Sequence, residues 1–293
     1  MIITPSRAWT GVVLAVVSSL CFALNMTLGR LSYESGADAF TLNLVRMSAF
    51  ALLLLALLKA QGRPIALPRH QAASRILIGI LLSLQILAAL AAIAYLPIGL
   101  AILVYYTYPF AIAAVAAVLD RHRLPCHGLA AMALAFAGLA LALGARADIL
   151  HPIGLALAAF AAASFAVVLL WTGRSMAGTD SKTLTFHIMA SGAVFLGAVA
   201  LIKGGLAWPQ DDAGWAAFAA SSALFGLATL TLFLAIERIG ALKTSFIDFG
   251  SPVWTILFGI LLLGEEMTPM QWLGAALVVV AIIGHQAFEV RRR

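Results

Sequence analysis

Two charged side chains lie well inside long apolar stretches of this 293-residue chain, Asp248 within residues 240–263 and Arg46 within residues 38–58. If these stretches cross a membrane, a charge near the centre costs about 2.5–3.5 kcal/mol, so each side chain must face protein or water. Asp248 can then carry a proton or hold a cationic group. Arg46 can bind an anionic group of a ligand, pair with Asp248, or make a purely structural hydrogen bond to a neighbouring helix.

Polar neighbours accompany both charged residues. Asn43 lies three residues before Arg46 on the same helical face and can share its role. Asp248 belongs to a polar stripe with three-, four- and seven-residue spacings, formed by Thr244, Ser245, Ser251 and Thr255. Ser251 is a candidate ligand contact in this stripe. Asn25, in the first apolar stretch, is a weaker candidate.

A tyrosine cluster lies at the centre of residues 97–119, which pass without a formal charge. Tyr105 and Tyr108, three residues apart, share a face with Pro109 and can offer rings and hydroxyls to a ligand. Tyr106 points elsewhere, and we expect it to pack. A proline beside these hydroxyls weakens the helical hydrogen bonding at membrane depth. Such a break is tolerated where the helix faces protein or a water-filled cavity.

The stretch 240–263 repeats this arrangement in the second half of the chain, with Pro252 matching Pro109 and Asp248 matching Tyr105. The difference in residue number is the same for both matched pairs, and we call it the repeat offset. We therefore expect two broken helices with polar centres that cross near mid-membrane and line one cavity. The complete set of predicted ligand-binding residues is Tyr105, Tyr108, Asp248, Arg46, Asn25 and Ser251.

Composition places these stretches in a membrane. The chain is 63% hydrophobic and 10% charged, with a mean hydropathy of +1.04, which is typical of a polytopic membrane protein. The net charge of +6 is assigned to loops beside anionic lipid, and we expect no nucleic-acid partner. Cys21 and Cys126 fit neither a disulfide framework nor a metal-ligand spacing. The first apolar run lacks a small-residue cleavage site, so we interpret it as a retained span.

Hydropathy predicts ten membrane spans joined by short loops, which leaves no room for a soluble domain. Their approximate ranges are about 9–29, 38–58, 75–95, 97–119, 126–144, 152–171, 182–202, 213–236, 239–263 and 268–288.

The distribution of Lys and Arg predicts the orientation. With the N-terminus inside, three of the 18 basic residues fall outside, and Arg46 lies within a span. This bias makes both termini cytoplasmic. The outer three are Arg30, Arg146 and Lys203, and the other fourteen are Arg7, Lys59, Arg63, Arg69, Arg75, Arg121, Arg123, Arg174, Lys182, Arg238, Lys243, Arg291, Arg292 and Arg293.

The two halves of the chain, residues 1–145 and 146–293, are predicted to be repeats of five spans each. A seam of small residues in the first span recurs in the sixth at the repeat offset, as Gly11, Ala15, Ser19, Ala23 and then Gly154, Ala158, Ala162, Ala166. Because five is odd, the second copy must enter the membrane inverted, as in many transporters. An old duplication kept for packing is the alternative.

The chain resembles EamA-type carriers of the drug/metabolite transporter superfamily over essentially its whole length. The matching segments are SLCFALNMTLGR in the first span, Arg46 midway along the second, PIGLAILVYYTYPFAIAAVAAVL, SFAVVLLWTGR, and SPVWTILFGILLLGEEMTPMQWLGAALVVVAIIG. Gly264-Glu265 is typical of the family, whereas its first-half counterpart, Asp120 to Arg123, departs from it. The resemblance implies secondary transport, usually export, of small metabolites.

The residues themselves favour transport over two other classes. No catalytic constellation, metal-ligand spacing or nucleotide-binding motif occurs, so we expect no cofactor and an ion gradient or exchange as the energy source. We predict an all-α secondary transporter of the cytoplasmic membrane that moves a small polar metabolite, such as an amino acid, by alternating access. Its partners would be that substrate, membrane lipid and, as a candidate, a coupling proton, and it would be a monomer or homodimer. The alternatives are a lipid-acting membrane enzyme, which needs polar residues at one interface, and a scaffold, which needs no buried charge.

The charge count gives a direct test of topology. Reporter fusions at residues 65 and 293 are expected to show cytoplasmic activity, because the Lys59–Arg75 loop and the C-terminus carry much of the basic charge. Periplasmic reporter activity at either position would contradict the predicted orientation.

Overall fold

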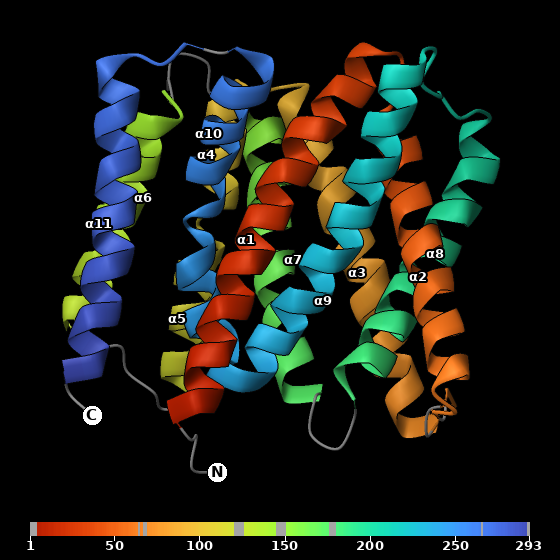
Figure 1. Ribbon diagram of the computed structural model, residues 1–293, viewed down its shortest axis with the longest axis horizontal. Coiled ribbons are helices and arrows are strands. Elements are labelled where there is room, and N and C mark those ends of the chain that lie inside the picture. The colour runs from red at the N-terminus through yellow and green to blue at the C-terminus, as the bar shows by residue number, and fades with distance from the viewer. Residues whose placement is uncertain are drawn as a thin grey trace.

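The computed structural model describes residues 5–63, 65–66, 69–119, 126–144, 151–175, 180–264 and 266–291, and all regular structure in these ranges is helical. The helices are α1 (Pro5–Glu34), α2 (Ala39–Ala60), α3 (Arg69–Ile93), α4 (Ile98–Tyr105), α5 (Tyr108–Leu119), α6 (Cys126–Ala142), α7 (Pro152–Ser175), α8 (Ser181–Lys203), α9 (Asp212–Asp248), α10 (Ser251–Leu263) and α11 (Pro269–Arg291). They form one bundle of roughly antiparallel helices (Figure 1).

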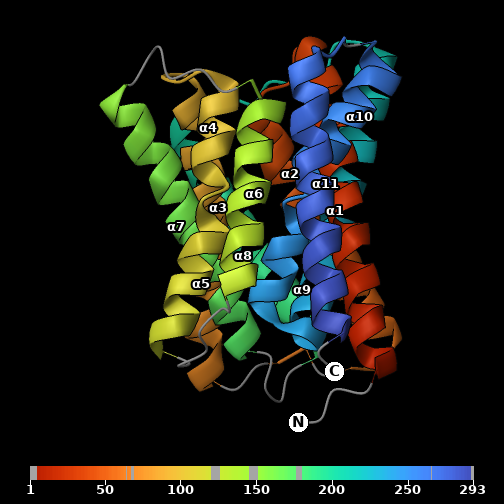
Figure 2. The same ribbon diagram turned by 90° about the vertical axis from the view of Figure 1, so that its left-hand side faces the viewer.

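The predicted all-α membrane fold is confirmed. Among the described residues, seven helical segments are long and apolar enough to span a membrane, and α6, α10 and most of α11 are shorter apolar helices that complete ten crossings. α1 begins and α11 ends at the same end of the bundle in both views (Figures 1 and 2), as an even number of crossings requires. Arg121 and Arg123, which entered the orientation argument, and Glu265, which belongs to the family motif, lie outside the described residues.

The boundary between the eighth and ninth predicted spans is a tight turn inside the element α9. This 37-residue element comprises the eighth span and the first half of the ninth, two helices that meet at a kink. The change of direction occurs at Gly240, whose backbone angles of φ 81° and ψ 161° are not helical. Glycine adopts this conformation without the steric penalty of a Cβ atom, so the chain turns back with no intervening loop.

Both predicted helix breaks are present and match at the repeat offset. α4 ends at Tyr105 and α5 begins at Tyr108, while α9 ends at Asp248 and α10 begins at Ser251. The cause is proline: Pro109 and Pro252 have no N–H to donate to the carbonyls of Tyr105 and Asp248, four residues earlier, and their rings clash with those carbonyls. Each break therefore leaves one backbone carbonyl without its helical hydrogen bond, that of Tyr105 in the first repeat and that of the equivalent Asp248 in the second.

The two halves interlock across the repeat boundary. α1 packs along α9, and the equivalent helix pair, α7 and α3, packs in the same way. α2 packs against its counterpart α8. α6 packs against its counterpart α11, and these two helices lie side by side in both views (Figures 1 and 2). This pattern of contacts is unchanged when the two halves are exchanged, as expected for inverted repeats.

The small-residue seams make two of these contacts possible. A Cβ atom at Gly11 would lie 2.5 Å from Cγ2 of Ile239, and one at Gly154 would lie 2.7 Å from Cγ of Leu96. Gly154 follows Gly11 by the repeat offset, and Ile239 follows Leu96 by the same interval. The same close approach of a glycine to the end of the partner helix is thus built twice, and neither site accommodates a larger residue without displacement.

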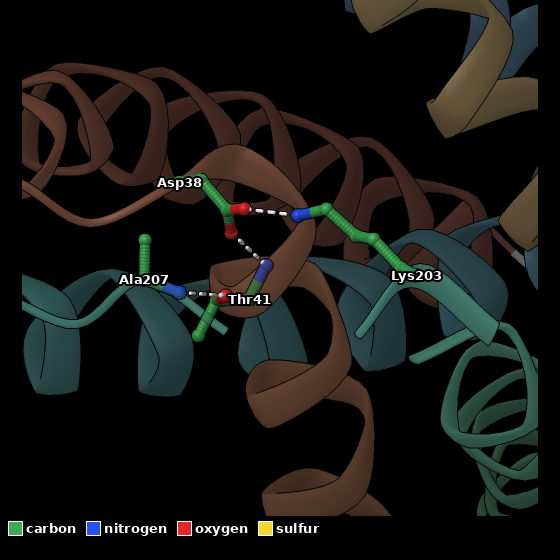
Figure 3. Close-up of polar contacts among 4 residues, drawn as sticks. All are labelled: Asp38, Thr41, Lys203 and Ala207. Atoms are coloured by element: carbon green, nitrogen blue, oxygen red, sulfur yellow. Dashed lines mark hydrogen bonds and ion pairs between the residues drawn. The ribbon is translucent and has the colours of Figure 1, made fainter. Parts of the chain in front are cut away.

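Two ion pairs, which we call the end ion pairs, join α2 to α8 at opposite ends of the bundle. At one end Lys203 contacts the carboxylate of Asp38, which also accepts the N–H of Thr41 at 2.6 Å and so caps α2 (Figure 3). The Thr41 hydroxyl in turn accepts the N–H of Ala207 at 3.1 Å. Partial burial alone would raise the pKa of Asp38, but the hydrogen bonds from Lys203 and Thr41 outweigh it and hold the pKa below its ordinary value.

At the other end Arg63, just beyond α2, pairs with Asp180 at 3.0 Å. Asp180 occupies the N-cap position of α8, as Asp38 does for α2, but its side chain makes no capping hydrogen bond. Both ion pairs are partly exposed to solvent, and such pairs contribute only about 0–1 kcal/mol each. The two end ion pairs therefore fix the alignment of α2 with α8 but contribute little to the free energy of unfolding.

The difference between the two caps can be measured. Asp38→Ala should destabilise the detergent-solubilised protein by about 1 kcal/mol more than Asp180→Ala, because only Asp38 caps its helix. Asp38→Asn, which keeps a capping oxygen, should cost no more than Asp180→Asn. Since the pKa of Asp38 is lowered, its contribution should be complete above about pH 4 and disappear as the pH falls through the folded-state pKa. Equal losses for the two alanine variants in thermal unfolding would contradict the cap.

Candidate functional site

The two broken helices meet at a buried hydrogen bond. The hydroxyl of Tyr108, at the start of α5, donates to Oδ2 of Asp248, at the end of α9, over 2.7 Å. Tyr108 is fully buried and Asp248 is 9% exposed. Because Tyr108 and Asp248 come from different repeats, this bond directly links the break in the first half to the break in the second.

An aromatic cluster surrounds this bond. The rings of Tyr105, Tyr106 and Tyr108 lie with centroids 5.6–5.8 Å apart. Phe165 of α7 stacks on Tyr105 at 5.6 Å and meets Tyr108 edge-on at 4.8 Å. Phe249, between α9 and α10, contacts Tyr106 at 6.1 Å. The expectation that Tyr106 packs is confirmed, but it packs within the same cluster because the break brings all three tyrosines together.

Most of the polar stripe on the ninth span proves to be satisfied within its own helix. The hydroxyls of Thr244 and Thr255 donate to carbonyls four residues earlier at 2.8 and 3.0 Å, and Ser245 donates to Leu242 at 2.8 Å. Such backbone bonds are the usual arrangement for serine and threonine in apolar helices. Ser251 differs, because its hydroxyl lies 3.3 Å from the carbonyl of Ser19 and ties α10 to α1.

Arg46 and Asn25 belong to a second cluster, between α1, α2 and α9. The guanidinium of Arg46 donates Nε–H to Oδ1 of Asn43 at 2.9 Å and Nη1–H to Oδ1 of Asn25 at 3.5 Å. It lies 4.0 Å above the ring of Phe225. Ser221 donates to the same oxygen of Asn25 at 2.8 Å. We call Arg46, Asn43, Asn25, Ser221 and Phe225 the arginine cluster.

The interpretation of Arg46 as the ion-pair partner of Asp248 is wrong. Both residues are among those described, and the structure gives no ion pair between them. Arg46 is held by asparagine side chains and an aromatic ring, and Asp248 by a tyrosine. The structure therefore brings Tyr105, Tyr108 and Asp248 together and groups Arg46 with Asn25 elsewhere.

Two polar side chains of α8 contact backbone carbonyls and not each other. His187 and Ser191, one turn apart on α8, do not pair through their side chains: His187 Nε2 lies 2.8 Å from the carbonyl of Ile65, and Ser191 donates to the carbonyl of His187. Among the described residues no group of acidic, histidine and cysteine side chains could hold a metal ion. The predicted cavity between the broken helices stays a prediction.

Sequence reasoning missed the phenylalanines. Phe165 contacts two of the tyrosines, and Phe22, its equivalent in the first repeat, meets Phe225 edge-on at 6.1 Å. Phe165 thus belongs to the aromatic cluster, and Phe22 contacts Phe225 of the arginine cluster. The matched positions of Phe22 and Phe165 were visible in the sequence, but their partners come from distant helices that no spacing reveals.

An apolar groove opens at the side of the bundle between α2 and α9. Its volume is about 440 Å³, and it is lined by Val45, Ala49, Phe50, Leu53, Trp208, Trp215, Phe218, Ala219, Ser222 and Ala223. None of the six predicted ligand-binding residues lines it.

The hydrogen bond between the breaks has a measurable contribution. Tyr108→Phe should lower the stability of the detergent-solubilised protein by about 1–3 kcal/mol, because it leaves the buried carboxyl of Asp248 without its donor. Tyr105→Phe is the matched control, since its ring lies in the same cluster but its hydroxyl makes no hydrogen bond to Asp248 in the described structure. Equal losses of melting temperature in the two variants would show that the bond contributes nothing.

Comparisons with known proteins agree with this architecture. A crystal structure described only as "Crystal structure of protein" superposes with a TM-score of 0.82 at 21% identity, covering 97% of this chain and 98% of that chain. At this identity the likeness establishes the fold alone. A search of curated proteins gives no match. The profile of the EamA-like transporter family matches twice, over residues 9–144 and 152–285. The chain therefore belongs to the EamA-like transporter family of the drug/metabolite transporter superfamily.

Proposed function

We propose that this multi-pass membrane protein is a secondary transporter that exports a small polar metabolite, such as an amino acid or a related compound, by alternating access. The observation that carries the proposal is the Tyr108–Asp248 hydrogen bond at the junction of two broken helices from opposite repeats. In inverted-repeat transporters, substrate and coupling-ion sites lie at such interrupted helices near mid-membrane.

The geometry of the breaks supports binding at this depth. α4 contributes about eight residues from one end of the bundle before it breaks, and the segment after Gly240 contributes eight from the other, so both breaks lie roughly 12 Å inside. Open backbone groups at such depth require protein or a polar ligand around them. The rings and hydroxyls of Tyr105 and Tyr108, with the hydroxyl of Ser251, are the groups that we assign to the substrate.

Asp248 is the group that we assign to energy coupling. A carboxyl inside the membrane is costly when charged, so it is suited to gaining and losing a proton as the two access states exchange. Its Tyr108 partner comes from the other repeat, so relative movement of the two halves would change its surroundings directly. A proton gradient is the proposed energy source.

The remaining features of the proposal follow from the sequence. Residues 1–145 and 146–293 would be the two repeats, in a monomer or homodimer surrounded by lipid in the cytoplasmic membrane, with both termini cytoplasmic. The lipid-acting enzyme considered as an alternative is set aside, because the family to which the chain belongs is one of transporters.

The experiment is transport by reconstituted protein. In proteoliposomes with an imposed proton gradient, assayed against labelled amino acids and organic cations, Asp248→Asn should lose uphill accumulation by at least about tenfold while still inserting and folding. Exchange of labelled for unlabelled substrate, which needs no proton movement, should persist. Asp212→Asn, which changes an exposed aspartate at the start of α9, is the matched control. Undiminished uphill accumulation by Asp248→Asn would rule out the coupling role.

A further inference from the structure

We infer that the arginine cluster is a binding site for the carboxylate of the transported substrate, separate from the Asp248 site. This inference rests on the proposed function only in taking the bound carboxylate to be part of the substrate. The binding itself is a property of Arg46 and Asn43.

The first argument is a surplus of hydrogen-bond donors. A guanidinium carries five N–H groups, and the described bonds of Arg46 use one on Nε and one on Nη1. Asn43 accepts from Arg46 through Oδ1, while its fully buried Nδ2 has no hydrogen-bond partner. Buried polar groups are almost always paired, so unpaired donors gathered in one place indicate a missing acceptor.

The second argument is charge. Arg46 is only 8% exposed, and its described polar partners, Asn43 and Asn25, are neutral amides. The ring of Phe225 covers one face of the guanidinium and leaves the edge, where the N–H groups point, for other partners. A buried cation without an anion is costly, and a bound carboxylate would remove that cost with two parallel hydrogen bonds.

The third argument comes from the repeat. At the repeat offset, the positions equivalent to Arg46, Asn25 and Phe225 hold Met189, Val168 and Leu82. All three are buried apolar side chains of the main core cluster. The same helix packing is therefore built in the other half without any charge, so the architecture does not require an arginine at this place.

Depth determines which anion fits. Arg46 lies seven residues into α2, and Ser221 nine residues into α9, so the cluster lies roughly 10–14 Å below the end of the bundle that carries Asp38. A lipid phosphate at the membrane surface does not extend to this depth. A small soluble carboxylate can, and the planar guanidinium matches its geometry better than that of a spherical halide.

The test uses the full-length protein in detergent and acetate as the probe. Sodium acetate replaces sodium chloride at constant sodium while the melting temperature is measured. Acetate should raise the melting temperature saturably, by about 3 °C. Arg46→Lys, which keeps the charge but not the planar fork, should shift the midpoint at least about tenfold to higher acetate.

Asn43→Asp is the decisive variant, because it places a carboxylate of the protein itself against Arg46. It should fold and lose the acetate response. Arg30→Gln, which changes an exposed arginine on α1, should keep the acetate response. A melting temperature independent of acetate in the unmodified protein, an equal response to chloride, or an unchanged response in Asn43→Asp would each overturn the inference. The melting temperature reports acetate binding without any transport assay. A transport result that rules out the coupling role of Asp248 would therefore not affect this test.

Discussion

The fold depends on a constraint of the membrane interior: each backbone carbonyl released by a proline must be enclosed by protein or by a polar ligand. Pro109 and Pro252 release the carbonyls of Tyr105 and Asp248 at mid-depth, where lipid offers no hydrogen bond. The surrounding helices supply the enclosure. Phe165 of α7 and the neighbouring tyrosines cover one break, and Ser251 anchors the other to α1. The prolines cause the breaks, and the bundle closed around them makes the breaks tolerable at this depth.

The repeats are symmetric in packing and asymmetric in chemistry. The contact of Gly11 with Ile239 recurs as the contact of Gly154 with Leu96, and the helix breaks coincide to the residue. The charged side chains do not recur, since Asp248 is matched by Tyr105 and Arg46 by Met189. Helix packing explains the features that the two repeats share. It does not explain a charged residue that occurs in one repeat alone. Both proposed sites lie where the two copies differ.

Much of this could be predicted from the sequence, because hydropathy and the repeat offset can be read without knowing how the helices pack. The spans, the two breaks and the matching of Tyr105 with Asp248 required no knowledge of neighbouring helices. The boundary predicted between the spans 213–236 and 239–263 corresponds to the Gly240 turn, although the sequence did not show that one glycine makes the turn without a loop. The supposed Arg46–Asp248 pair failed because helical periodicity shows which face a side chain occupies but not which helix lies opposite. The roles of Phe165, Phe225 and Ser221 depend on that second kind of information.

The interlocking of α1 and α2 with α9 has a consequence for biosynthesis. Translation proceeds from the N-terminus, so Arg46 enters the membrane about 180 residues before Ser221 and Phe225 are made, an interval of roughly 9–36 s at typical elongation rates. Until α9 is inserted, the guanidinium has only first-half contacts, and the described ones are Asn43 on its own helix and Asn25 on α1. The two asparagines are thus the described partners already made during that interval, and Phe225 joins them once α9 is inserted.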